Sequence, residues 1–260
     1  MIEEPYRWVE AVANRREYIE TQLATGSPIA AVGCRDGILF LTLGRNRQKV
    51  FEIYDRIAMG AIGHPGDIER LRMGAIELAS AEGFTRSAAD VSLRRLAYYS
   101  LSPMLKAAFE QIYGAPYLAR MLFAEIGDKP ENDLFLRIEY DGAIATNGAT
   151  LAAEVRQDFG ALSGTRISTE LMETYLKEEH EPTATRQRAL KTALHAWGVG
   201  KMALGDDAAR GLPAKEAIAA EVQKQLRASA VEAAILERDA KITLRYRTLT
   251  EGEIQSVIAA

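Results

Sequence analysis

The stretch QKVFEIYDRIAMGAIG, residues 48–63, decides the fold class because it has the pattern of two short strands joined by a tight turn. Both strands are largely apolar on each face, as expected for strands that are covered on both sides. Two more apolar runs, residues 28–32 and 38–44, come just before it and are joined through Asp36-Gly37. That dipeptide is a strong hairpin signal because glycine adopts positive φ at little cost. The sequence therefore predicts antiparallel hairpins.

The rest of the chain alternates between blocks of helix and blocks of strand. Apolar residues at helical spacing predict helices, and short apolar runs predict strands. The predicted helices cover residues 67–83, 87–114, 168–178, 183–200 and 250–260, and the predicted strands lie in 117–127, 133–144, 159–164, 230–238 and 241–249. Such blocks predict an α/β (α+β) fold in four layers, an αββα sandwich with two mainly antiparallel sheets between helix layers. Because no internal repeat or long linker interrupts the chain, residues 1–260 are predicted to form a single domain.

Local signals refine three of these segments. Pro103 is expected to kink or split the helix at 87–114, because proline cannot continue a helical hydrogen-bond ladder. Thr250 and Glu253 have capping-box spacing at the start of the last helix. Residues 203–228 are alanine-rich and charged, and we predict a surface insertion with its own helix there.

The segment before the first strand predicts an amphipathic helix over residues 6–25. Trp8, Val12, Ile19 and Leu23 recur at near-helical spacing with charges between them. Gly26 should end the helix, since glycine tolerates the positive φ common after a last turn. A helix ahead of the first strand must pack either on the finished domain or on a neighbouring subunit.

Composition excludes several classes of protein. The chain has 260 residues, 48% of them hydrophobic and 26% charged, as in ordinary globular proteins. A net charge of −4 gives no electrostatic case for binding nucleic acid or an anionic membrane. No apolar run approaches the roughly 20 residues that a spanning helix needs. The single cysteine, Cys34, excludes a disulfide framework within the chain, and cytoplasm is the expected location.

Familiar catalytic motifs are missing from the sequence. The three histidines, His64, His180 and His195, are scattered and show no metal-ligand spacing, so we expect no metal. The sequence has no P-loop, no GxGxxG motif and no GxSxG elbow, and we expect no cofactor. One arrangement remains: Ser27 stands after Gly26 at the head of the first strand, with Lys49 ahead of the third. In an N-terminal-nucleophile hydrolase, cleavage after such a glycine frees an α-amine that serves as the base.

At this point the sequence resembles the first half of a proteasome subunit. Residues 27–91, from SPIAAV to SAADV, contain the QK-V and YDR elements, the glycine-rich strand end and the LR-x-G helix of that family, in the same order. The resemblance is good over residues 6–145, weaker but similar in layout afterwards, and strongest to the bacterial, actinobacterial-like α type. It implies the Ntn-hydrolase fold. In catalytic β subunits the mature chain begins with threonine and carries an acid about 16 residues later.

The residues at those positions favour an α subunit. Ser27 occupies the place of the nucleophile, and the place of the acid falls on Leu43. Pro28 follows the serine, has no N–H and restricts Ser27 to extended geometry. The resemblance therefore implies a non-catalytic subunit of a homo-heptameric α ring. Its partners would be other α subunits, β-type catalytic subunits and an AAA-type unfoldase or activator.

The resemblance also assigns roles to individual residues. Lys49 would line a pocket that pairs with the C-terminal carboxylate of a docking activator, as a charge-assisted hydrogen bond allows. Gly26 would form the floor of that pocket, and Met1, Ile2, Glu3, Glu4 and Pro5 would act as a short gate at the axial pore. Two alternatives stay open. One is a self-processing serine hydrolase that uses Ser27 and Lys49, and the other is a stand-alone homo-oligomeric scaffold; a third interpretation of Lys49 is an ordinary solvated charge.

Overall fold

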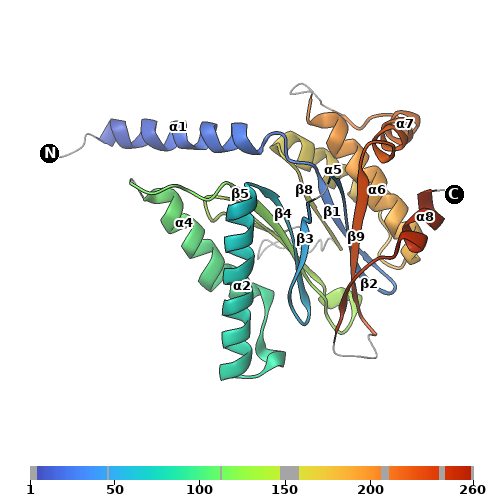
Figure 1. Cartoon of the computed structure of the whole chain (residues 1–260), viewed down its shortest axis with the longest axis horizontal. Coiled ribbons are helices and arrows are strands. Elements are labelled where there is room, and N and C mark those ends of the chain that lie inside the picture. The colour runs from blue at the N-terminus through green and yellow to red at the C-terminus, as the bar shows by residue number, and fades with distance from the viewer. Residues whose placement is uncertain are drawn as a thin grey trace.

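The fold is a four-layer sandwich in which two sheets face each other between layers of helices (Figure 1). The structure is a computed structural model, and it describes residues 5–45, 47–111, 113–146, 158–205, 211–239 and 244–258. Within these residues, each sheet has five strands and every pairing is antiparallel. The predicted αββα architecture is therefore confirmed.

The first sheet has the strand order β10-β9-β2-β1-β8, and the second has the order β3-β4-β5-β6-β7. The strands of the first are β1 Ile29–Cys34, β2 Gly37–Gly44, β8 Phe159–Leu162, β9 Ala230–Glu237 and β10 Tyr246–Thr248; those of the second are β3 Val50–Tyr54, β4 Ile57–Gly63, β5 Ala119–Glu125, β6 Leu134–Ile138 and β7 Ile144–Thr146. The quoted stretch thus supplies β3 and β4, which are hairpin neighbours, as predicted.

The hairpin predicted at Asp36-Gly37 joins β1 to β2. Cys34 pairs with Gly37, so Arg35 and Asp36 form the turn and Gly37 is the first residue of the strand. Gly37 has φ +151°, and a Cβ there would lie 1.9 Å from the Leu236 carbonyl oxygen on β9. Glycine is required at this position because of both its backbone conformation and the close approach of a neighbouring strand.

Helices cover both outer faces of the sandwich (Figure 1). On the second sheet lie α2 Pro65–Thr85, the short α3 Leu93–Arg95 and α4 Ser102–Glu110; on the first lie α5 Arg166–Glu179 and α6 Arg186–Ala203, with α7 Lys215–Leu226 and α8 Glu251–Ile258 packed on α6. A separate apolar core, which includes Ile29, Phe40 and Leu122, fills the space between the sheets. Strands buried on both faces explain the continuous apolar runs in the sequence.

Between residues 87 and 114 the structure differs in detail from the single helix that the sequence predicts. The chain forms a 3₁₀ turn at Ala88–Asp90, the short α3, a π-helical segment at Leu96–Leu101, and then α4, which ends at Glu110 rather than Gly114. Pro103 lies in the first turn of α4, directly after the π-helical segment. Proline supplies no N–H for the preceding ladder, so the break on its N-terminal side follows from its chemistry.

The C-terminal part contains the helices that the sequence predicts. The capping box of α8 is present, because the Glu253 carboxylate accepts from the Thr250 backbone N–H at 2.8 Å while the Thr250 hydroxyl accepts from the Glu253 N–H at 3.3 Å. Within 203–228 the structure has α7, whose Ile218 and Val222 are buried against α6. Residues 206–210 of that segment lie outside the described residues. That 203–228 is an insertion stays a prediction.

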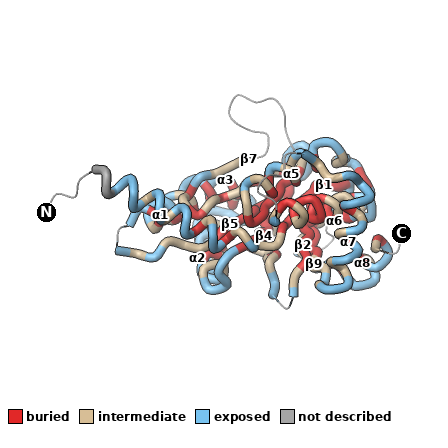
Figure 2. Tube along the Cα trace, turned by 90° about the horizontal axis from the view of Figure 1, so that it is seen from above, coloured by how far each residue is buried: buried red, intermediate tan, exposed pale blue. Residues whose placement is uncertain are grey.

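The first helix, α1 Pro5–Leu23, is anchored at one end only (Figures 1 and 2). Ile19 and Leu23 are buried against Phe109 and Tyr140, whereas Trp8 is 40% exposed. The N-terminal half extends away from the sandwich, and the burial pattern in Figure 2 shows it as largely exposed. The helix therefore presents an apolar stripe of which only the C-terminal end is covered within this chain.

Candidate functional site

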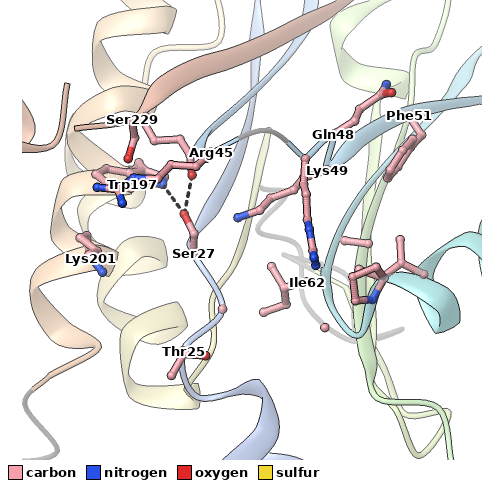
Figure 3. A pocket seen from close by; sticks show the side chains of 18 of the residues that line it. Thr25, Ser27, Arg45, Gln48, Lys49, Phe51, Ile62, Trp197, Lys201 and Ser229 are labelled. Atoms are coloured by element: carbon pink, nitrogen blue, oxygen red, sulfur yellow. Dashed lines mark hydrogen bonds between the residues drawn. The ribbon is translucent and has the colours of Figure 1, made fainter. Parts of the chain in front are cut away.

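A cavity of about 870 Å³ opens where the start of β1 and the end of β2 face α6 on one side and the β3–β4 hairpin on the other. It contains the serine and the lysine that the sequence singles out (Figure 3). Its lining residues come from six elements and their connections, and the ones used below are Gly26, Ser27, Lys49, Phe51, Trp197 and Lys201. The structure thus brings the neighbours Gly26 and Ser27 into one cavity with Lys49, which lies 22 residues after Ser27 in sequence.

The hydroxyl of Ser27 is engaged by two neighbours. It donates a hydrogen bond of 2.7 Å to the carbonyl oxygen of Leu43, the residue 16 positions later. It also accepts one of 3.3 Å from the indole N–H of Trp197, a residue that is 2% exposed. Leu43 stands where an acid would be needed, and it offers only a backbone carbonyl and a buried apolar side chain. These contacts hold the hydroxyl in place without supplying a base that could take its proton.

Gly26 lines the cavity for a steric reason. Its backbone N–H donates to the Leu23 carbonyl at 2.8 Å, which closes the end of α1. A Cβ at Gly26 would lie 3.0 Å from both Ile62 Cδ1 and the Leu23 oxygen. The φ angle of Gly26 is not positive, so the predicted reason for a glycine here is wrong. Close packing of the turn on β4 favours a residue without a side chain instead.

Lys49 is held by its backbone, which leaves its ammonium group available. Both oxygens of the Glu232 carboxylate accept from the Lys49 N–H at 3.0 Å, and one also accepts from the Val50 N–H at 2.9 Å. The ammonium has no hydrogen-bond or ion-pair partner among the residues that the structure describes. In Figure 3 the side chain points into the cavity, toward the side that carries Ser27. The backbone is fixed, while the charged end is free to meet a ligand.

Burial sets the electrostatics of this lysine. Desolvation lowers the pKa of the Lys49 ammonium, the Glu232 carboxylate raises it in part, and Lys201 lowers it further. Burial raises the pKa of Glu232, while the two backbone N–H groups that it accepts from oppose that change. Arg45, Arg47 and Lys201 also line the cavity, and Glu69 is the only acid among its lining residues in the described part of the chain. The site therefore favours an anion.

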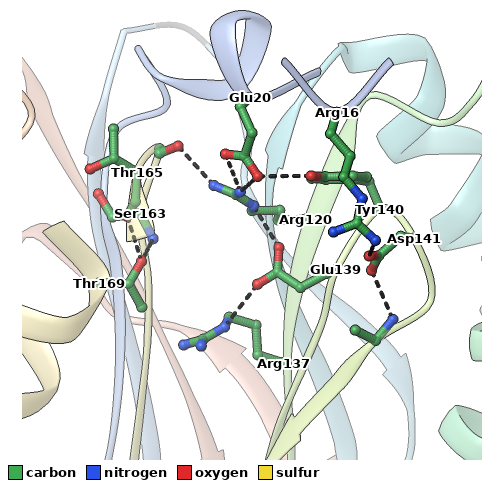
Figure 4. Close-up of polar contacts among 12 residues, drawn as sticks. Arg16, Glu20, Arg120, Arg137, Glu139, Tyr140, Asp141, Ser163, Thr165 and Thr169 are labelled. Atoms are coloured by element: carbon green, nitrogen blue, oxygen red, sulfur yellow. Dashed lines mark hydrogen bonds and ion pairs between the residues drawn. The ribbon is translucent and has the colours of Figure 1, made fainter. Parts of the chain in front are cut away.

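A buried arginine connects α1 to the sandwich next to this cavity (Figure 4). Arg120 on β5 is 5% exposed and binds both oxygens of Glu20 on α1, at 2.5 and 2.6 Å. It also donates to Glu139 at 2.6 Å and to the Gly164 carbonyl at 2.8 Å. Gly164 in turn lies so close to the end of α1 that a Cβ would meet the Ala24 oxygen at 2.5 Å. This cluster fixes the segment from which the chain enters the cavity at Gly26.

Sequence reasoning missed several residues of this region. Glu232, Trp197, Lys201 and Arg120 come from segments distant in sequence, and no local motif marks them. Arg120 could have been noticed, because an arginine inside the apolar run 117–127 must find buried partners. Of the predicted gate residues, Met1, Ile2, Glu3 and Glu4 lie outside the described residues, and Pro5 begins α1. Among the residues described, no group of three or more His, Cys, Asp or Glu side chains could hold a metal ion.

The fold and this site together define the structural class of the protein. Two antiparallel sheets between helix layers, with a serine at the head of the first strand and a lysine in the same cavity, are the arrangement of the Ntn-hydrolase fold.

No protein-family model matches the sequence. Within the described part of the chain, none of the helices combines the length and the apolarity that crossing a bilayer requires.

Known relatives identify the family within that class. The chain is 33% identical to the proteasome subunit alpha of Streptomyces coelicolor over 189 residues, which are 72% of this chain and 69% of that protein. It is 30% identical to the proteasome subunit alpha of Actinosynnema mirum over 232 residues, 88% of this chain and 78% of that protein. It is 27% identical to the same subunit of Thermobifida fusca over 238 residues, 88% and 80% of the two chains. The chain belongs to the proteasome α-subunit family.

Proposed function

We propose that this chain is a non-catalytic α-ring subunit of a proteasome core particle, which controls the access of substrates to catalytic β subunits. The observation that carries the proposal is that one cavity contains a Ser27 hydroxyl with two hydrogen-bond partners and a Lys49 ammonium with none among the described residues. The hydrogen bonds of Ser27 support the absence of nucleophilic chemistry. The free ammonium of Lys49 supports recognition of an anionic ligand. Membership of the α-subunit family supplies the setting, a cytoplasmic ring that binds other α subunits and β-type subunits.

We further propose that the cavity binds the C-terminal carboxylate of an AAA-type unfoldase. A terminal carboxylate is an anion at the end of a slender chain, so it can enter a recess that excludes a folded surface. A charge-assisted hydrogen bond between this carboxylate and a partly buried ammonium is short and about twice as strong as a neutral one. The predicted gate residues, Met1, Ile2, Glu3, Glu4 and Pro5, are proposed to narrow the axial pore of the ring.

Retention of the N-terminal helix tests the non-catalytic assignment. We expect the intact mass of the chain, after co-expression with a β-type subunit, to include residues 1–26, because the contacts of Ser27 provide no base for cleavage at Gly26-Ser27. Ser27→Ala should leave peptide hydrolysis by the mixed particle unchanged within about twofold. A mature chain that begins with Ser27, or activity that disappears with Ser27→Ala, would instead establish the self-processing hydrolase.

The same co-expression separates the ring subunit from a stand-alone scaffold. Native mass spectrometry should detect particles that contain both chains. If only assemblies of this chain form in the presence of its β partner, the scaffold interpretation is correct.

The pH dependence of unfoldase docking follows from burial of Lys49. Carboxylate binding needs the charged ammonium, and burial lowers the pKa of Lys49 in the free protein. The affinity of docking should therefore fall as pH rises, and the fall should begin at a lower pH than for a surface lysine. Once the Lys49 amine of the free protein is neutral, the affinity should fall by up to tenfold per pH unit. Affinity of the unfoldase for the core particle, measured against pH, checks this. The Lys49→Arg particle should lose the dependence, because arginine stays charged.

A further inference from the structure

A second cavity, of about 670 Å³, continues from the Lys49 cavity along the edge of β3. The two cavities share the lining residues Gln48, Phe51 and Glu69, so they adjoin each other. The second runs between α2 on one side and Tyr246 of β10 on the other, and β3 is the edge strand of its sheet. We call it the β3 groove; its remaining lining residues are Glu52, Ile53, Tyr54, Asp55, Arg72 and Ile76.

The β3 groove and the Lys49 cavity have opposite charge. The cavity is lined by Arg45, Arg47, Lys49 and Lys201 against Glu69, and the groove is lined by Glu52, Asp55 and Glu69 against Arg72. Moreover, the Arg72 guanidinium already forms an ion pair with Glu69. Its Nε and Nη2 atoms bind the two oxygens of Glu69 at 2.9 and 2.6 Å, and its guanidinium lies 5.6 Å from the centre of the Phe51 ring.

The remaining carboxylates of the groove are left without strong partners. Within the described residues, the Glu52 carboxylate makes no hydrogen bond or ion pair, and the Asp55 carboxylate has only a 4.0 Å contact with Arg245. Burial and the proximity of Asp55 both raise the pKa of Glu52, which is the sign of a carboxylate that lacks a cation. A cationic group placed here would relieve that repulsion.

We propose that the β3 groove selects a basic side chain about three residues before the terminal carboxylate of the docking partner. This inference rests on the proposed role of Lys49. Lys49 and Glu52 are three residues apart along the edge of the sheet, a span of roughly 10 Å, and an extended peptide covers the same distance with the same number of residues. If the tail follows β3 in an extended conformation from a carboxylate bound at Lys49, its third residue upstream lies level with Glu52. The acid-lined groove and the base-lined cavity together recognise the order of charges along the tail.

Labelled peptides with a free C-terminus test this proposal. We choose Ser-Gly-X-Ala-Ala-Leu, fluorescein-labelled at its N-terminus, with X as Lys, Ala or Glu, and measure fluorescence anisotropy on the full chain assembled with its β subunit. The Lys peptide should bind about tenfold more tightly than the Glu peptide, since an exposed charge pair and a repulsion of similar size act in opposite directions. Glu52→Gln should remove most of this preference, and Glu52→Lys should reverse it.

Controls separate this inference from the proposal beneath it. Glu77→Gln changes an exposed acid on α2 that lines neither cavity, and it should leave the preference intact. Equal affinity for the three peptides, with binding that still requires Lys49 and the free carboxylate, would overturn the groove proposal alone. If no peptide binds, or if an amidated C-terminus binds equally well, the carboxylate-docking role of Lys49 is wrong and the groove proposal is overturned with it.

Discussion

Replacing Lys49 by alanine is expected to abolish unfoldase-driven degradation of folded substrates while the particle still assembles. The substitution removes the charged end that the Lys49 cavity holds open for a carboxylate, and it removes no hydrogen bond that the lysine side chain makes within the described residues. The backbone contacts with Glu232 are made by N–H groups, so alanine can keep them. Loss of one partner of an enclosed charge pair costs about 2 kcal/mol or more of binding free energy. This corresponds to a loss of at least about 30-fold in affinity at the Lys49 cavity of each subunit.

The measurement compares two rates on the same particle. Hydrolysis of a short fluorogenic peptide reports the β active sites, and ATP-dependent degradation of a folded protein reports docking. We expect Lys49→Ala to reduce only the second rate. The matched control is Lys224→Ala, which removes an exposed lysine on α7 that lies outside the cavity and pairs with Glu221. Unchanged degradation by the Lys49→Ala particle would show that Lys49 is an ordinary surface charge.

The fold was predictable from the sequence because its signals are local. The β1–β2 and β3–β4 hairpins follow from apolar runs around short turns, and the caps of α8 follow from residues three apart. Prediction failed where distant parts of the chain set the geometry. The reason for glycine at position 26 is one case, because a side chain there would crowd Ile62 on β4.

The candidate site was predictable only in part, and for the same reason. Ser27, Gly26 and Lys49 were found from their place ahead of the strands and from the family resemblance. Glu232, which fixes the Lys49 backbone, lies 183 residues later on β9, and it reaches the site only because β9 pairs with β2. The pairing of β9 with β2 cannot be predicted from local patterns in a single sequence. The same holds for the Trp197 indole, which reaches Ser27 from α6.

Replacing Arg120 by methionine is expected to destabilise the chain by about 2–3 kcal/mol and to release α1. Methionine fills similar space but leaves Glu20, Glu139 and the Gly164 carbonyl without their shared donor. Breaking a buried ion pair by removing one partner costs about 3–5 kcal/mol. We expect less here because the side chains of Glu20 and Glu139 are 45% and 24% exposed, so water can solvate them in the variant.

The released end of α1 should be detectable apart from the loss of stability. Chemical denaturation measures the free energy of unfolding, and hydrogen exchange of the amides around Glu20 measures local opening of the helix. Arg16→Ala is the matched control, because Arg16 also ties α1 to the sandwich, through Asp141 at 3.0 Å, but its side chain is 55% exposed and the pair should contribute less than about 1 kcal/mol. If Arg120→Met lowers stability no more than Arg16→Ala, the cluster is not what anchors α1. If it lowers stability while exchange at α1 is unchanged, the anchor is the apolar contact of Ile19 and Leu23 with Phe109 and Tyr140 instead.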